Sequence, residues 1–153
     1  MSGFVWFWGW VALSVRAYDR NLGIVPPDWT RGFAIPLMAI GAIVALLCAG
    51  TFVVVGRGTP APFDAPREFV AVGPYKYVRN PMYIGALIVL FGFGLYLHSF
   101  SVLLLPFAVF LLVHLFVVLY EEPNLRGRFG PSYEDYCRRV SRWIPRVPHA
   151  QTE

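Results

Sequence analysis

The chain has 153 residues, of which 57% are hydrophobic and only 14% are charged. A soluble domain of this length cannot bury so much apolar surface, so the composition excludes an ordinary soluble protein and indicates an integral membrane protein. The net charge of +4 does not indicate nucleic-acid binding, because the basic residues lie at the ends of apolar segments, where anionic lipid headgroups are their expected partners.

Four apolar segments predict four membrane-spanning helices, at residues 3–15, 33–55, 82–97 and 100–120. The first is short and aromatic, and it lacks the basic flank of a signal peptide. We expect the last two to form a tight helical hairpin, since only His98 and Ser99 separate them. Basic residues follow the second and fourth segments, so we expect these regions and both chain ends to face the cytoplasm.

The connector between the second and third segments, residues 56–72, is rich in glycine and proline. Five such residues in its first eleven positions exclude a long regular helix. We therefore predict an ordered loop over the cytoplasmic face, with a short extended piece at residues 67–72.

The third segment has a clear helix start at Asn80 and Pro81. An asparagine side chain satisfies free main-chain N–H groups at a helix N-terminus, and proline fits the first helical position. Arg79 directly precedes this start, so its guanidinium lies beside the positive end of a helix. That arrangement is favourable if an anion is held between them.

The fourth segment ends at the charged pair Glu121 and Glu122, and Pro123 follows. Beyond it, Ser132 and Asp135 resemble a capping box at the start of a short amphipathic helix. Its apolar side chains recur at helical spacing, at Tyr133, Tyr136, Cys137 and Val140. We expect this helix to lie along the cytoplasmic headgroup region.

Neither a disulfide nor a metal site is expected. Cys48 lies in the middle of a predicted span and Cys137 in the predicted cytoplasmic tail, so the two cannot pair. The three histidines are isolated from the cysteines and from one another, without the spacing of metal ligands.

From residue 56 to residue 145, the chain resembles the membrane methyltransferases that include isoprenylcysteine carboxyl methyltransferase and phosphatidylethanolamine N-methyltransferase. The order and spacing of several short motifs carry the resemblance. These are Gly73-Pro74-Tyr75, Arg79-Asn80-Pro81-Met82-Tyr83 with Gly85, Glu121-Glu122, Leu125, Phe129-Gly130, Tyr133, Tyr136, Val140 and Pro145.

The resemblance implies an all-α integral membrane bundle of about four spans that binds S-adenosyl-L-methionine and methylates a lipid-like acceptor from the bilayer. One membrane domain is expected, with N-terminal spans at 1–55, a cofactor-binding core at 56–145 and a tail at 146–153. It is expected in the plasma or inner membrane, as a monomer or homodimer.

The expected reaction is O-methylation of an isoprenylcysteine-type carboxylate. Asn80 and Pro123 depart from the usual prenylcysteine pattern and favour the alternative, N-methylation of a phosphatidylethanolamine-type phospholipid. The tyrosine-rich tail favours the prenylcysteine branch. A third alternative is a scaffold that keeps the fold without enzymatic activity.

Three charged residues are the candidate catalytic groups: Arg79, Glu121 and Glu122. The candidate cofactor-binding residues are Tyr75, Arg79, Asn80, Pro81, Tyr83, Gly85, Gly92, Gly94, Glu121, Glu122, Tyr133 and Tyr136. The carboxylates can accept hydrogen bonds from the ribose or ammonium of the cofactor, and the guanidinium can hold its carboxylate. Simpler interpretations stay open: solvated helix ends for the charges, interfacial aromatics for the tyrosines, and helix packing for the glycines.

Overall fold

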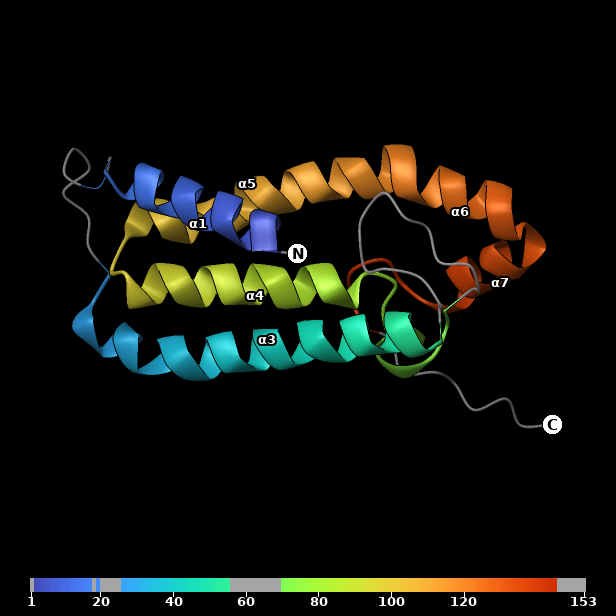
Figure 1. Cartoon of the computed structure of the whole chain (residues 1–153), viewed down its shortest axis with the longest axis horizontal. Coiled ribbons are helices and arrows are strands. Elements are labelled where there is room, and N and C mark those ends of the chain that lie inside the picture. The colour runs from blue at the N-terminus through green and yellow to red at the C-terminus, as the bar shows by residue number, and fades with distance from the viewer. Residues whose placement is uncertain (1, 18, 20–25, 56–69, 146–153) are drawn as a thin grey trace. The chain divides into compact units, whose positions relative to one another are not determined.

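A computed structural model of the chain describes residues 2–17, 19, 26–55 and 70–145 (Figure 1). These residues form helices, and in the described ranges the only strand-like pairing recorded is an isolated bridge between Val78 and Ser141. The predicted all-α class is therefore confirmed. The elements are α1 (Ser2–Arg16), η1 (Asp28–Thr30), α3 (Arg31–Val54), η2 (Gly73–Lys76), α4 (Pro81–Tyr96), α5 (Phe100–Phe116), η3 (Val117–Glu121), α6 (Glu122–Phe129) and α7 (Pro131–Arg139).

Among the residues that the structure describes, two helical segments are long and apolar enough to cross a membrane, Asp28–Val54 and Phe100–Phe129. The helix α4 is apolar but has only 16 residues, and α1 has 15. Length and composition thus support two of the four predicted spans. Most of the predicted connector, residues 56–69, and the predicted tail, residues 146–153, lie outside the described residues.

The fourth predicted span continues further than expected. The sequence predicted an end at residue 120, but the helix runs on to Phe129. A single turn of π-helix, η3, occupies Val117–Glu121, and α6 follows it directly. Pro123 is tolerated because it lies in the first turn of α6, where a missing N–H group costs little.

The chain divides into two compact units. Unit 1 comprises Met1–Ile43 and Gly85–Val113, and unit 2 comprises Val44–Ile84 and His114–Glu153.

In unit 1, glycines allow α4 to approach its neighbours closely. A Cβ atom on Gly41 of α3 would lie 2.6 Å from the main-chain oxygen of Gly85, and one on Gly92 would lie 2.6 Å from Cγ of Met38. A Cβ on Gly94 would lie 2.9 Å from the main-chain nitrogen of Leu103. This close packing supports the packing interpretation of the α4 glycines.

The predicted hairpin in unit 1 is confirmed, because α4 ends at Tyr96 and α5 begins at Phe100. His98 adopts a positive φ of 52° in the turn. The first free N–H groups of α5 are satisfied by side chains: Ser101 donates to Asp19 over 2.9 Å, and Val102 donates to Ser99 over 3.2 Å. Burial alone would raise the pKa of Asp19, but hydrogen bonds from the two serines outweigh it and hold the pKa below its usual value.

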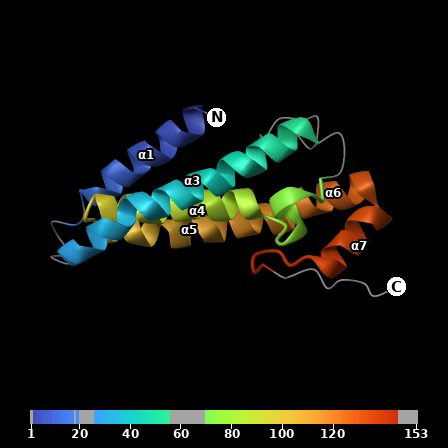
Figure 2. The ribbon, with the colours of Figure 1, turned by 90° about the horizontal axis from the view of Figure 1, so that it is seen from below.

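In unit 2, α7 turns back beside α6 (Figure 2). One buried cluster contains Tyr133, Tyr136 and Val140, the apolar face that the sequence predicted. This face packs against Leu125 and Phe129 of the protein itself. The position of α7 along the headgroup region stays a prediction.

The predicted capping box at the start of α7 does not form. The helix begins after Gly130, whose φ of 53° favours glycine, and no side chain caps it. Asp135 instead pairs with Arg138 one turn later, over 2.7 Å.

Candidate active site

A buried carboxylate, Glu122, lies at the centre of the polar cluster of unit 2, and only 3% of the residue is exposed. Arg79 donates from Nη1 to its Oε1 over 2.9 Å. Arg142 binds both oxygens, with Nε 2.7 Å from Oε1 and Nη2 2.9 Å from Oε2. Nη2 of Arg126 lies 3.6 Å from Oε2. Three guanidinium groups thus surround one carboxylate, and the pair with Arg142 has the planar two-point geometry of a strong ion pair.

Main-chain contacts fix the arginines in place. The amide of Arg79 donates to the carbonyl of Ser141 over 2.9 Å, and the side chain of Asn80 donates to the carbonyl of Arg142 over 3.2 Å. The segment after α7 is therefore attached to the start of α4. The predicted helix start is confirmed, since α4 begins at Pro81.

The same C-terminal segment also contacts the helix that precedes η3. The indole Nε1 of Trp143 donates to Nδ1 of His114 over 3.0 Å. This contact requires a neutral imidazole with an unprotonated Nδ1. The contact gives His114 a hydrogen-bond partner within unit 2.

The neighbouring carboxylate, Glu121, has a different partner. Tyr83, one turn into α4, donates its hydroxyl to Oε2 of Glu121 over 3.1 Å. Glu121 ends the π-helical turn and Glu122 begins α6, so the backbone changes its hydrogen-bonding pattern between the two. π-helical turns of this kind occur frequently at functional sites.

Arg79 has an additional contact and an unsatisfied donor. Its Nη1 lies 3.0 Å from Sγ of Cys137. Its Nε is buried and has no hydrogen-bond partner among the described residues. Glu122 is an anionic partner of Arg79, and the predicted anion between Arg79 and the positive end of α4 stays a prediction.

Three of the candidate cofactor-binding tyrosines belong to the buried core of unit 2. Tyr75 packs against Phe52 with ring centroids 5.4 Å apart, and Tyr136 donates its hydroxyl to the carbonyl of Tyr75 over 2.7 Å. Tyr133 is buried in the same cluster as Tyr136. Burial raises the pKa of all three hydroxyls, so they stay neutral and act as packing and hydrogen-bonding groups.

The structure therefore brings together five of the candidate residues: Arg79, Asn80, Tyr83, Glu121 and Glu122. Pro81 begins the helix that carries Tyr83. The three candidate glycines, Gly85, Gly92 and Gly94, belong to unit 1. A Cβ atom on Gly92 or Gly94 would meet a neighbouring helix, and the main-chain oxygen of Gly85 lies against Gly41. The cofactor-binding and catalytic roles stay predictions.

Sequence reasoning missed Arg126, Cys137 and Arg142 as members of the cluster. Arg126 follows Glu122 by four residues on one helix, a spacing that indicates an ion pair once the helix is known to continue. Arg142 lies outside α7, and nothing in the local pattern indicates its partner. Hydrogen bonding to Glu122 raises the pKa of Arg142, which keeps it charged.

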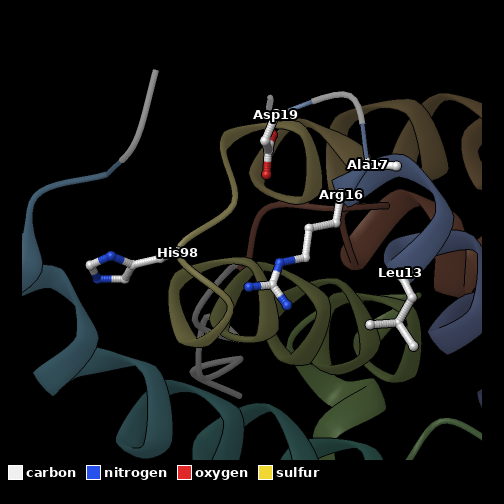
Figure 3. A pocket seen from close by; sticks show the side chains of 5 residues that line it. All are labelled: Leu13, Arg16, Ala17, Asp19 and His98. Atoms are coloured by element: carbon white, nitrogen blue, oxygen red, sulfur yellow. The ribbon is translucent and has the colours of Figure 1, made fainter. Parts of the chain in front are cut away.

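Unit 1 contains a separate open pocket of about 510 Å³, lined by Leu13, Arg16, Ala17, Asp19 and His98 (Figure 3). None of these is a candidate site residue. Across the described ranges, no three histidine, cysteine or acidic side chains are grouped as metal ligands would be.

Comparison with known proteins gives a family match. The sequence model of a family described as phospholipid methyltransferase matches residues 29–132, which include Arg79, Tyr83 and both glutamates but not Arg142. The chain is 37% identical over 79 residues, 52% of its length, to the protein-S-isoprenylcysteine O-methyltransferase of Schizosaccharomyces pombe.

Two further relatives carry names from metal resistance. The chain is 30% identical over 116 residues, 71% of its length, to a nickel-cobalt-cadmium resistance protein of Alcaligenes xylosoxydans xylosoxydans. It is 31% identical over 78 residues, 51% of its length, to a cobalt-zinc-cadmium resistance protein of Cupriavidus metallidurans. The aligned part covers 54% of the Alcaligenes protein, 34% of the yeast protein and 36% of the Cupriavidus protein. No solved structure matches the chain.

Proposed function

The chain belongs to the phospholipid methyltransferase family of membrane proteins, and on that premise we propose that it transfers a methyl group from S-adenosyl-L-methionine to a lipid-like acceptor in the bilayer. The supporting observation is the meeting of Arg79, Tyr83, Glu121 and Glu122 within the matched region. These residues come from two segments that are separated in sequence, the start of α4 with the residue before its cap and the junction of η3 with α6, and both belong to unit 2.

The residues present fit this cofactor. Glu121 has one recorded partner, the neutral hydroxyl of Tyr83, so its carboxylate has capacity for ribose hydroxyls or an ammonium group. The buried Nε of Arg79 is a donor that a carboxylate would satisfy. When bound, the cofactor supplies an activated methyl group: its carbon–sulfur bond breaks as the acceptor bonds to the methyl, and the electron pair stays on sulfur.

The protein residues then orient the two reactants. Tyr83 holds the Glu121 carboxylate in one position, and the arginines around Glu122 hold the ends of two helices together. Alignment of donor and acceptor in a site that excludes water supplies much of the catalysis of such a displacement.

We propose an isoprenylcysteine-type carboxylate as the acceptor, and the identity to the yeast O-methyltransferase supports this choice. A carboxylate is already nucleophilic at neutral pH and needs no base. A phospholipid amine is the second candidate, supported by the description of the matching family. An ammonium group must first lose a proton, and Glu121, which among the described residues forms no ion pair with the arginines of the cluster, is the candidate base.

Methyl transfer is tested by incubating the purified protein with radiolabelled S-adenosyl-L-methionine and membrane lipids, supplemented with a farnesylcysteine derivative. A methyl ester releases its label in mild base, whereas an N-methyl group retains it, so one treatment separates the two acceptors. Glu121→Gln is expected to lose most of the transfer. A folded wild-type protein that labels no lipid would favour the scaffold alternative.

We also propose that the chain spans the membrane four times, with the Glu122 cluster and the C-terminus on the cytoplasmic side. The basic residues of unit 2 support this orientation, since Arg126, Arg128, Arg138 and Arg139 are exposed and suit anionic headgroups. A C-terminal green fluorescent protein fusion in a bacterial inner membrane is expected to fluoresce. Activity of a C-terminal alkaline phosphatase fusion would contradict the orientation.

A further inference from the structure

The Glu122 cluster has more positive than negative charge. Three guanidinium groups, those of Arg79, Arg126 and Arg142, lie within 4 Å of Glu122. The other carboxylate, Glu121, has the uncharged hydroxyl of Tyr83 as its recorded partner. Three cations thus face two anions among the described residues. An excess of one positive charge favours an anion beside the cluster.

The three arginines differ in their access to solvent. The side chain of Arg79 is 13% exposed, that of Arg142 is 30% exposed and that of Arg126 is 52% exposed. Arg142 and Arg126 both direct Nη2 toward the same oxygen, Oε2 of Glu122, at 2.9 Å and 3.6 Å. Two guanidinium groups therefore lie side by side at the accessible edge of the cluster, whereas Arg79 lies inside it.

The helix that carries Arg126 exposes apolar side chains before it in the sequence. Leu115, Leu119 and Tyr120 precede Glu122 on the same continuous helix, and all three are exposed, Leu119 by 72%. One stretch of helix thus presents apolar side chains followed by a cation. This order complements an amphiphile with a hydrocarbon chain and an anionic head.

We propose that Arg126 and Arg142 bind the oxyanion of the methyl acceptor, and so select acceptors that carry an anionic group next to a hydrocarbon chain. The inference rests on the proposed function and narrows its substrate class. The oxyanion is either the carboxylate of a prenylated cysteine or the phosphodiester of a phospholipid. The carboxylate is planar and the phosphodiester is tetrahedral, and arginine binds both kinds of oxyanion through its N–H groups. Because Nε and Nη2 of Arg142 already bind Glu122, Nη1 of Arg142 and the guanidinium of Arg126 would supply the donors.

Kinetics of the full-length protein provide the first test. Arg126→Gln and Arg142→Gln are expected to raise KM for the acceptor about tenfold or more, because each removes a charge-assisted contact, while KM for S-adenosyl-L-methionine stays within about twofold. Arg128→Gln is the matched control on the same helix, two residues from Arg126 and therefore directed differently. Arg142→Lys keeps the charge and is expected to recover part of the affinity.

Arg142→Gln also removes an ion pair of Glu122, so its melting temperature is measured alongside its kinetics. Arg126 carries little of that structural load, since its contact is long and exposed, and Arg126→Gln separates recognition from folding. A rise in KM for the donor and not for the acceptor would overturn the inference, as would unchanged KM values in both variants.

Binding without turnover provides a second test that is independent of catalysis. Native mass spectrometry compares N-acetyl-S-farnesylcysteine with its methyl ester, and phosphatidylethanolamine with a diacyl amine that lacks the phosphate. The wild type is expected to prefer one or both anionic members about tenfold, and Arg126→Gln to lose that preference. No preference in the wild type overturns the inference. A preference without methyl transfer leaves the inference standing and rejects the proposed enzymatic function.

Discussion

Replacing Glu122 by glutamine is expected to cost about 3 kcal/mol of stability. The carboxylate makes three short contacts with two guanidinium groups, and removal of one partner of a buried ion pair costs about 3–5 kcal/mol. The expected loss of unfolding free energy lies at the lower end of that range for two reasons. The amide keeps an oxygen that can accept one of these bonds, and Arg142 is exposed enough to recover contact with water. Arg79 is left with a buried charge whose main partner is gone.

The assay is thermal unfolding in detergent, followed by tryptophan fluorescence. In a protein of this size 1 kcal/mol changes the melting temperature by about 2–4 °C, so Glu122→Gln should melt about 6–12 °C below the wild type. Glu121→Gln is the matched control, because it weakens one bond to a neutral hydroxyl and should cost about 1 kcal/mol. Equal melting temperatures for the two variants would refute the assignment of Glu122 as the structural centre of the cluster.

Three further substitutions test other parts of the structure by the same melting assay. Gly92→Ala places a Cβ 2.6 Å from a neighbouring side chain and should cost about 1–3 kcal/mol, whereas Gly32→Ala, with nothing within 4 Å, should cost none. Asp19→Asn should melt below the wild type at neutral pH. Because the folded pKa is lowered, this stabilisation is complete above the unfolded value of about 3.9 and disappears as the pH falls through the folded pKa. A difference in melting temperature that does not shrink as the pH is lowered below that unfolded value would contradict the role. Tyr136→Phe loses a buried 2.7 Å hydrogen bond to the carbonyl of Tyr75 and should cost about 1–2 kcal/mol; an unchanged melting temperature would show that this bond contributes nothing.

Local sequence signals predicted the features that depend on neighbouring residues. The Asn80–Pro81 pair marks the start of α4 because proline fixes its own φ and disfavours a helical residue before it. The spacing of Tyr133, Tyr136 and Val140 identifies one buried face of α7. In both cases a few adjacent residues determine the outcome, and no distant partner is needed.

The features that sequence reasoning missed depend on contacts between distant residues. Val117, Leu119 and Tyr120 have the same apolar character in an α-turn as in a π-turn, so the pattern cannot distinguish the two. The buried face of α7 has the same spacing whether it meets lipid or protein. Arg142 pairs with a residue 20 positions away, and its guanidinium reaches Glu122 only because Ser141 and Asn80 attach that segment to α4.

The adjacent glutamates illustrate how a small site can separate stability from ligand binding. Two adjacent carboxylates within one continuous helix repel each other, so both need compensation. The arginines neutralise Glu122 almost completely, and the change from π to α geometry places Glu121 against Tyr83 instead. Glu121 therefore keeps accepting capacity for a cationic or hydroxyl-bearing ligand. The excess arginine charge at the edge keeps capacity for an anion, and together the two are suited to a donor and an acceptor of opposite polarity.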